Sequence, residues 1–78
     1  MENKIDIEIL KVLSIKRKPI SFTELLESSK DLEEYGKGYI LRRCMKLEKV
    51  FMIQTEKVSR TRMIKILDLG RALLRVYK

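Results

Sequence analysis

The sequence predicts a single α+β domain, spanning residues 1–78, in which helices precede an antiparallel hairpin and a closing helix. Two observations carry this class. Apolar residues recur at helical spacing near the start, in the middle and at the end of the chain. Before the last of these segments the spacing changes to alternation, because Lys65 separates Ile64 from Ile66 and β-branched residues become frequent. A chain this short buries only about 60 % of its unfolded surface, so helices and hairpin must share one small core.

The first helix is predicted over about Asn3 to Arg17, before the only proline, Pro19. Its core stripe, with Leu10 at the margin, consists of four apolar residues: Ile5, Ile9, Val12 and Leu13. Ile7 and Ile15 fall off that stripe, so the apolar face is wider than one core contact requires. The extra width suggests that this helix also packs against a partner helix.

After the proline, Ile20 is expected in a short extended segment that leads into a second helix. Ser21 and Glu24 have the S-x-x-E spacing of a capping box, in which each side chain accepts a hydrogen bond from a backbone N–H. The second helix is predicted over about Phe22 to Ser29. Its buried side chains are expected to be Phe22, Leu25 and Leu26. The polar stretch after it is predicted to be a connection with one helical turn at about Asp31 to Tyr35.

The third helix is predicted from about Gly38 to Val50, and it has two unlike sides. The side expected in the core carries Ile40, Cys44 and Leu47, flanked by Arg43 and Val50. The opposite side is mostly basic and carries Arg42, Met45, Lys46 and Lys49. A solvated charged face is the ordinary explanation of such a pattern, and a surface built for an acidic partner is the alternative.

Two strands are predicted over about Met52 to Lys57 and Arg62 to Leu67, joined through "VSRT" as an antiparallel hairpin. No Asn-Gly or Asp-Gly pair specifies the type of the turn. The last helix is predicted over Asp68 to Tyr77, with Asp68 as a candidate N-cap. Its core stripe is expected to comprise Leu69, Ala72, Leu73 and Val76.

Composition excludes several classes of protein. The chain has no histidine and a single cysteine, Cys44, which removes an internal disulfide, a zinc site of the usual Cys/His spacing and a histidine-based catalytic centre. We therefore expect a protein that is not an enzyme and that needs no metal and no cofactor. Charge interrupts the first helix from its second residue, so we expect no signal peptide, no membrane partner and a cytoplasmic location.

The net charge of +7 is unevenly distributed along the chain. Residues 1–35 carry 6 lysines and arginines against 8 acidic residues, a net charge of −2. The remaining residues carry 12 against 3, a net charge of +9. Such segregation is typical of a domain that presents one basic side to a polyanion, although it also serves solubility.

The order of the elements and three local sequences resemble the winged helix-turn-helix. "ISFTELLESS" is similar to its strand and first helix, "YILRRCMKLEKVFMI" to its recognition helix and next strand, and "MIKILDLGRALLRVYK" to its common ending. The resemblance spans about Ile5 to Tyr77 and implies a three-helix core, a two- to three-stranded antiparallel wing sheet and a C-terminal helix. The chain looks most like the small single-domain transcription regulators of archaea and their viruses and plasmids.

The chain departs from the pattern of that family in two places. Family members usually have glycine after the recognition helix, where the backbone turns through a left-handed conformation, and this chain has Phe51. Either Phe51 accepts strain or the helix ends differently, which leaves the register of the second strand open by about one residue. Leu67 occupies the usual threonine position before the last helix.

The resemblance implies a DNA-binding transcription regulator whose partner is double-stranded DNA. The helix at about 38–50 would read the major groove, and the wing at about 57–62 would contact the backbone or the minor groove. Arg42 is the first candidate for base readout, because its planar guanidinium can donate to both acceptors of a guanine. The other candidates for DNA contact are Lys37, Gly38, Tyr39, Arg43, Lys46 and Lys49 on the helix and Lys57, Ser59, Arg60 and Arg62 on the wing.

The spare apolar surface of the terminal helices predicts a homodimer. The expected interface residues are Ile7, Ile15, Leu74 and Tyr77. Two recognition helices would then lie about one DNA turn apart, and the protein would be associated with the nucleoid. Two alternatives stay open: an architectural chromatin protein that coats DNA with little sequence preference, and a winged-helix adaptor whose charges meet an acidic protein.

Overall fold

The computed structural model describes residues 4–77. Along the chain these residues form α1 (Lys4–Lys16), β1 (Ile20–Ser21), α2 (Phe22–Glu27), α3 (Lys30–Glu34), α4 (Lys37–Lys49), β2 (Ile53–Val58), β3 (Thr61–Ile66) and α5 (Asp68–Val76). This order confirms the predicted α+β class, and the single helical turn expected before the third long helix is the short helix α3. Asn3, where the first helix is expected to begin, lies outside the described residues.

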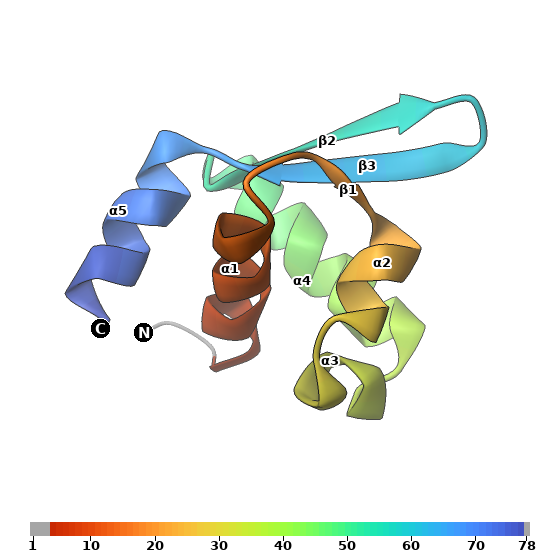
Figure 1. The fold of residues 1–78 in the computed structure, drawn as a ribbon, viewed down its shortest axis with the longest axis horizontal. Coiled ribbons are helices and arrows are strands. Elements are labelled where there is room, and N and C mark those ends of the chain that lie inside the picture. Colours follow the sequence, from red (N-terminus) through yellow and green to blue (C-terminus); the bar gives the residue numbers. More distant parts are fainter. Residues whose placement is uncertain (1–3, 78) are drawn as a thin grey trace.

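The strands form one antiparallel sheet in the order β1-β3-β2, and the helices pack against one of its faces (Figure 1). Ile53 lies opposite Ile66, and Thr55 lies opposite Ile64. Because residues two apart in a strand share a face, these four side chains lie on the same face of the sheet, where the three isoleucines are buried. Ile20 of β1 joins that face, since it pairs with Ile64 from the other side.

The core is centred on α1, which contacts α3, α4, α5 and β3. The predicted core stripe of α1 is buried, and Leu10, expected at its margin, is buried as completely, with 0 % exposure. Leu10 lies inside because α5 covers that side: its Cδ2 atom is 3.1 Å from where a Cβ on Gly70 would stand. Ile7 is half-buried and Ile15 is 77 % exposed, so the extra apolar width of α1 stays at the surface.

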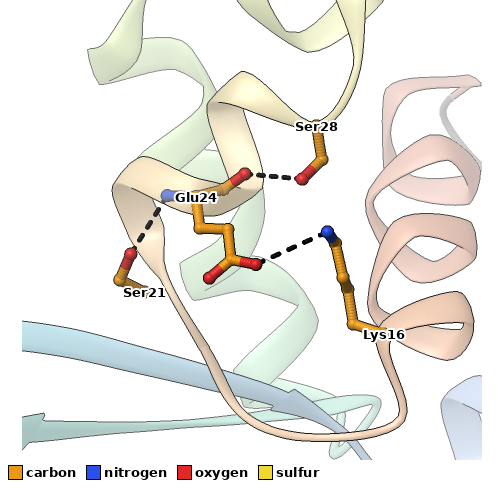
Figure 2. A network of polar contacts seen from close by, with 4 residues as sticks. All are labelled: Lys16, Ser21, Glu24 and Ser28. Atoms are coloured by element: carbon orange, nitrogen blue, oxygen red, sulfur yellow. Dashed lines mark hydrogen bonds and ion pairs between the residues drawn. The ribbon is translucent and has the colours of Figure 1, made fainter.

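The start of α2 is capped as the sequence predicts, but through only one side chain of the capping box. The hydroxyl of Ser21 accepts a hydrogen bond from the Glu24 N–H at 3.0 Å, while the Glu24 carboxylate points to Lys16, 3.4 Å away (Figure 2). The Glu24 side chain therefore ties α2 to α1. The helix ends at Glu27 rather than Ser29, because the Ser28 N–H and hydroxyl bond back to the carbonyls of Leu25 and Glu24.

Phe51 ends α4 in the left-handed conformation, with φ 63°. Its N–H donates to the Glu48 carbonyl at 3.0 Å, and the Met52 N–H donates to the Leu47 carbonyl at 3.0 Å. This pair of bonds is a Schellman motif, which usually has glycine at the left-handed position. The first of the two predicted outcomes is therefore correct: Phe51 accepts the strain, and the register of β2 starts at Ile53.

The last helix, α5, packs with a different stripe from the one predicted. Gly70 is buried and Leu73 and Leu74 pack against the core, whereas Leu69 is 51 % exposed, Val76 is 77 % exposed and Ala72 is also exposed. The stripe is displaced because Gly70 lets the helix approach the chain closely: a Cβ there would stand 2.5 Å from the Met52 carbonyl oxygen.

The two ends of α5 also differ slightly from the prediction. Leu67 is its N-cap, whereas Asp68 is the first helical residue and pairs with Arg71 at 3.1 Å, so Asp68 does not cap the helix. Tyr77 lies one residue past the last helical residue, and its N–H donates to the carbonyls of Leu73 and Leu74. These bonds close the last turn of the helix.

Candidate nucleic-acid interface

The helix α4 packs against α1 and β2 through the predicted apolar stripe. Ile40, Cys44 and Leu47 are all buried there. Burial raises the pKa of the Cys44 thiol to about 12, so the thiol stays protonated near neutral pH. Cys44 therefore serves as a small core residue, and the outward side of α4 is left for solvent or a partner.

The charged residues on the outward side of α4 are all cations, and the exposed Met45 lies among them. We call Lys37, Arg42, Lys46 and Lys49 the basic face, and all four are exposed. The only acidic residue of this helix, Glu48, is turned toward the sheet. Its carboxylate accepts hydrogen bonds from the hydroxyl of Thr55 at 2.9 Å and from the Thr55 N–H at 3.3 Å. These two bonds hold α4 against β2, and they also keep the Glu48 carboxylate away from the basic face.

Arg43 differs from the other cations of α4. Its Nε and Nη2 atoms donate to the two carboxylate oxygens of Asp6 in α1, at 2.8 and 2.6 Å, and the Arg43 side chain is only 20 % exposed. The hydrogen bond to Asp6 raises the pKa of Arg43 further. Because Asp6 is itself buried, it needs this cation, and Arg43 is already occupied within its own chain. We therefore leave Arg43 out of the candidate interface.

Sequence reasoning missed both acids that position α4. Asp6 stands four residues before Leu10 and seven before Leu13, on the core side of α1, and a carboxylate in that position requires a cation. The spacing of Asp6 from Leu10 and Leu13 could therefore have predicted a buried ion pair. Glu48 offers no such signal, because its partner Thr55 lies beyond the turn after α4, and only the geometry of that turn brings the two side chains together.

The start of α4 is open. Gly36 is its N-cap and has no side chain to accept a bond from the first turn, and its carbonyl accepts the N–H groups of Tyr39 and Ile40. The amides of Lys37 and Gly38 therefore have no acceptor within the helix. A Cβ at Gly36 or Gly38 would meet no atom within 4 Å, so the approach to these amides is unobstructed. Nearby, the ring of Tyr39 is half-buried and stacks on Tyr35 at 5.3 Å.

The β2–β3 hairpin forms the wing and projects past α2 (Figure 1). Val58 pairs with Thr61 across a tip made of Ser59 and Arg60, and Ser59 has a positive φ of 58°. Arg60 is exposed there. Lys57 lies directly opposite Arg62, on the same face of the sheet as Thr55 and hence as α4. Lys57, Arg60 and Arg62 form the wing cluster, and Lys57 and Arg62 lie on the face of the sheet that α4 contacts.

Of the four residues predicted for a dimer interface, Ile7 and Ile15 lie in α1, Leu74 lies in α5, and Tyr77 directly follows α5. Ile15, Leu74 and Tyr77 line a groove between these two helices, and Ile7 lines a second groove on the other side of α1, together with Tyr77. The structure thus brings the four residues to one side of the molecule.

No group of three or more potential metal ligands occurs within residues 4–77, and every helix in that range is too short or too polar to cross a membrane.

The fold matches that of solved structures. AF1382 from Archaeoglobus fulgidus superposes with a TM-score of 0.79 at 18 % identity, over 99 % of this chain and 84 % of that one. A PadR family transcription regulator from Clostridium difficile gives 0.80 at 16 %, over 96 % and 83 %. The transcriptional regulator YodB from B. subtilis gives 0.77 at 18 %, over 96 % and 72 %.

These likenesses establish the fold, which is the winged helix-turn-helix predicted from the sequence. In it, α4 is in the position of the recognition helix and the β2–β3 hairpin is the wing. No protein-family model matches the chain, and no curated protein matches it in sequence. What the protein does must therefore be argued from its own surface.

Proposed function

We propose that the chain is a DNA-binding transcription regulator that acts as a homodimer at the nucleoid, in the cytoplasm. In this proposal α4, at residues 38–50, reads the major groove, and the wing, at residues 57–62, contacts the backbone or the minor groove. One observation carries the proposal: the hairpin with the wing cluster is joined through Thr55 to Glu48 of α4, the helix that carries the basic face, and Lys57 and Arg62 lie on the face of the sheet that α4 contacts. Transcription regulators among the structural neighbours support the same function.

The wing favours DNA over a merely solvated surface. Lys57 and Arg62 are directly opposite each other in the sheet, and like charges in such a pair destabilise a hairpin. In a hairpin that faced only solvent, an acidic residue at one of the two positions would remove that repulsion. In the proposed complex, phosphates of the duplex remove it instead.

Each candidate residue has a role that follows from its chemistry. Arg42, exposed on the outward side of α4, donates to the base edge of a guanine. Lys46, Lys49 and the free amides of Lys37 and Gly38 hold phosphates, as a helix start does for anions generally. Tyr39 contributes a hydroxyl at the margin of the same helix. On the wing, phosphate or minor-groove contacts fall to Lys57, Ser59, Arg60 and Arg62.

Selection of bound duplexes from a random pool tests the function directly. A dimer that reads DNA through two α4 helices should select a palindromic site, and Arg42→Ala should weaken binding to that site by about 1–3 kcal/mol while relaxing its specificity. Lys57→Ala is the matched control, because it should weaken all duplexes alike and reduce the salt slope by about 1.

The same experiment separates the alternatives. Equal retention of all sequences would replace the regulator with an architectural chromatin protein. Absence of duplex binding at moderate salt would contradict the whole proposal and favour an adaptor that binds an acidic protein.

A further inference from the structure

The helix α1 lies between α5 and α3 (Figure 1). A groove lies on each side of α1. The basic groove, between α1 and α5, has a volume of about 380 Å³ and is lined by Lys11, Ile15, Arg71, Leu74, Arg75 and Tyr77 among others. The acidic groove, between α1 and α3, has a volume of about 430 Å³, and its lining includes Lys4, Ile7, Glu8, Asp31, Glu34 and Tyr35. Because Lys11 and Tyr77 line both, the grooves open side by side.

The charges of the two grooves are opposite. Every charged residue of the basic groove is a cation. In the acidic groove three carboxylates outnumber the two lysines. Arg75 on one side and Asp31 and Glu34 on the other are exposed and have no ion-pair partner among the described residues. The cations of the basic groove are therefore complementary to the carboxylates of the acidic groove.

Each groove also contains an apolar side chain of α1 that the core does not fully use. Ile15 lines the basic groove and is 77 % exposed, and Ile7 lines the acidic groove and is half-buried. A core as small as this one gains stability when such side chains are covered. The face around α1 thus has an exposed or half-buried apolar side chain in each groove and opposite charges at its two flanks, with Lys11 and Tyr77 between them.

We propose that a second copy of this chain covers this face so that the basic groove of each copy lies on the acidic groove of the other. A twofold axis in the contact plane, perpendicular to the line between the grooves, makes both contacts at once. It brings Arg75 of one copy toward Glu34 of the other. This inference rests on the homodimer in the proposed function and adds its register.

The charges exclude two other arrangements. A dimer that placed like grooves together would set Arg71 and Arg75 against their own symmetry copies, which is repulsive in a desolvated contact. A small anionic molecule would match the basic groove alone and leave the carboxylates beside it without a partner. A second copy satisfies both grooves with one interface.

Charge reversal on each side, and on both, tests the register. The dimer dissociation constant is measured by sedimentation equilibrium without DNA for wild type, Arg75→Glu, Glu34→Lys and the double variant. Arg75→Glu and Glu34→Lys should each raise the dissociation constant about tenfold, because each substitution acts at two symmetric contacts. The double variant exchanges the two charges and should return to within about threefold of wild type.

Matched controls carry the same charge changes outside the two grooves. Lys65→Glu in β3 and Glu33→Lys in α3 alter exposed residues that line neither groove, and both should leave the dissociation constant near that of wild type. Circular dichroism melts check that every variant folds.

The outcomes separate this inference from the proposed function. A dimer indifferent to both single reversals, or one weakened by both without rescue in the double variant, overturns the charge-paired register and leaves the homodimer intact. A wild-type chain that stays monomeric at hundreds of micromolar overturns the register and the homodimer together. Neither result bears on DNA contact by α4, which the Arg42→Ala measurement decides separately.

Discussion

The C-terminal end of α4 and the outward side of the same helix differ in what surrounds their residues. At the end, the Met52 carbonyl accepts the Leu67 N–H at 2.9 Å and lies against Gly70, and Phe51 holds a left-handed turn. We call these four residues the joint. Along the outward side, the residues of the basic face are exposed. The comparison teaches that backbone contacts determine which residues the joint can hold, whereas packing within the chain places little constraint on the residues of the basic face.

Substitution of Gly70 tests the joint most severely. Gly70→Ala should lower the free energy of unfolding by about 2–3 kcal/mol, because the new Cβ meets a backbone oxygen and two core side chains that cannot all yield. Denaturant melts measure the change.

The matched control for this substitution is at the exposed start of α4. Gly38→Ala is also in a helix, but its Cβ enters open space, so it should raise the free energy of unfolding by about 0.5–1 kcal/mol. Equal effects at the two glycines would remove the distinction between the joint and the basic face.

The ion pair of Arg43 marks the boundary between the two regions. Asp6→Ala should lower the free energy of unfolding by about 2 kcal/mol, because Arg43 would keep its largely buried position without a counter-charge. Chemical denaturation of Asp6→Ala and of the double variant Asp6→Ala/Arg43→Ala provides the test, and the double variant should lose less.

Asp68→Ala is the control, since it breaks an Asp–Arg pair on the exposed surface of α5 and should leave stability nearly unchanged. A similar loss in both aspartate variants would show that burial is not the source of the Asp6 effect.

Apart from the controls, the smallest effect is expected at Phe51, and the sign of this effect is the informative part. Phe51→Gly should raise the free energy of unfolding by about 1 kcal/mol, because glycine adopts the left-handed turn without a Cβ penalty and the phenylalanine ring is 73 % exposed. The neighbouring Val50→Gly should lower it instead, since Val50 has an ordinary φ of −100°. A loss at Phe51→Gly would mean that the ring contributes packing to the joint.

Local sequence patterns predict most of the fold because they report local physics. The helical spacing of Ile40, Cys44 and Leu47 identifies the buried stripe of α4, and the S-x-x-E spacing places the start of α2 at the correct residue. The α5 stripe was displaced because Gly70 permits a close approach between segments far apart in the sequence, and periodicity carries no record of such contacts.

In the candidate site, too, the sequence predicts what depends on local patterns and misses what depends on contacts between distant residues. The charge of the basic face and of the wing cluster is visible in the sequence, because composition and spacing alone place it. The occupation of Arg43 by Asp6 is a contact between residues 37 positions apart, and the sequence indicates only that Asp6 needs some cation. Which arginine supplies that cation depends on how α1 and α4 cross.

The two hydrogen bonds between Glu48 and Thr55 have a consequence for association with DNA. They connect the helix proposed for the major groove to the strand that carries the proposed wing contacts, so in the proposed complex the two elements would already be joined before a duplex binds. Little conformational entropy then remains to be lost at the moment of contact. In that complex, loss of the link through Thr55→Val would leave the charge of the surface unchanged and should still weaken binding, because the helix and the wing would have to be ordered at the moment of contact.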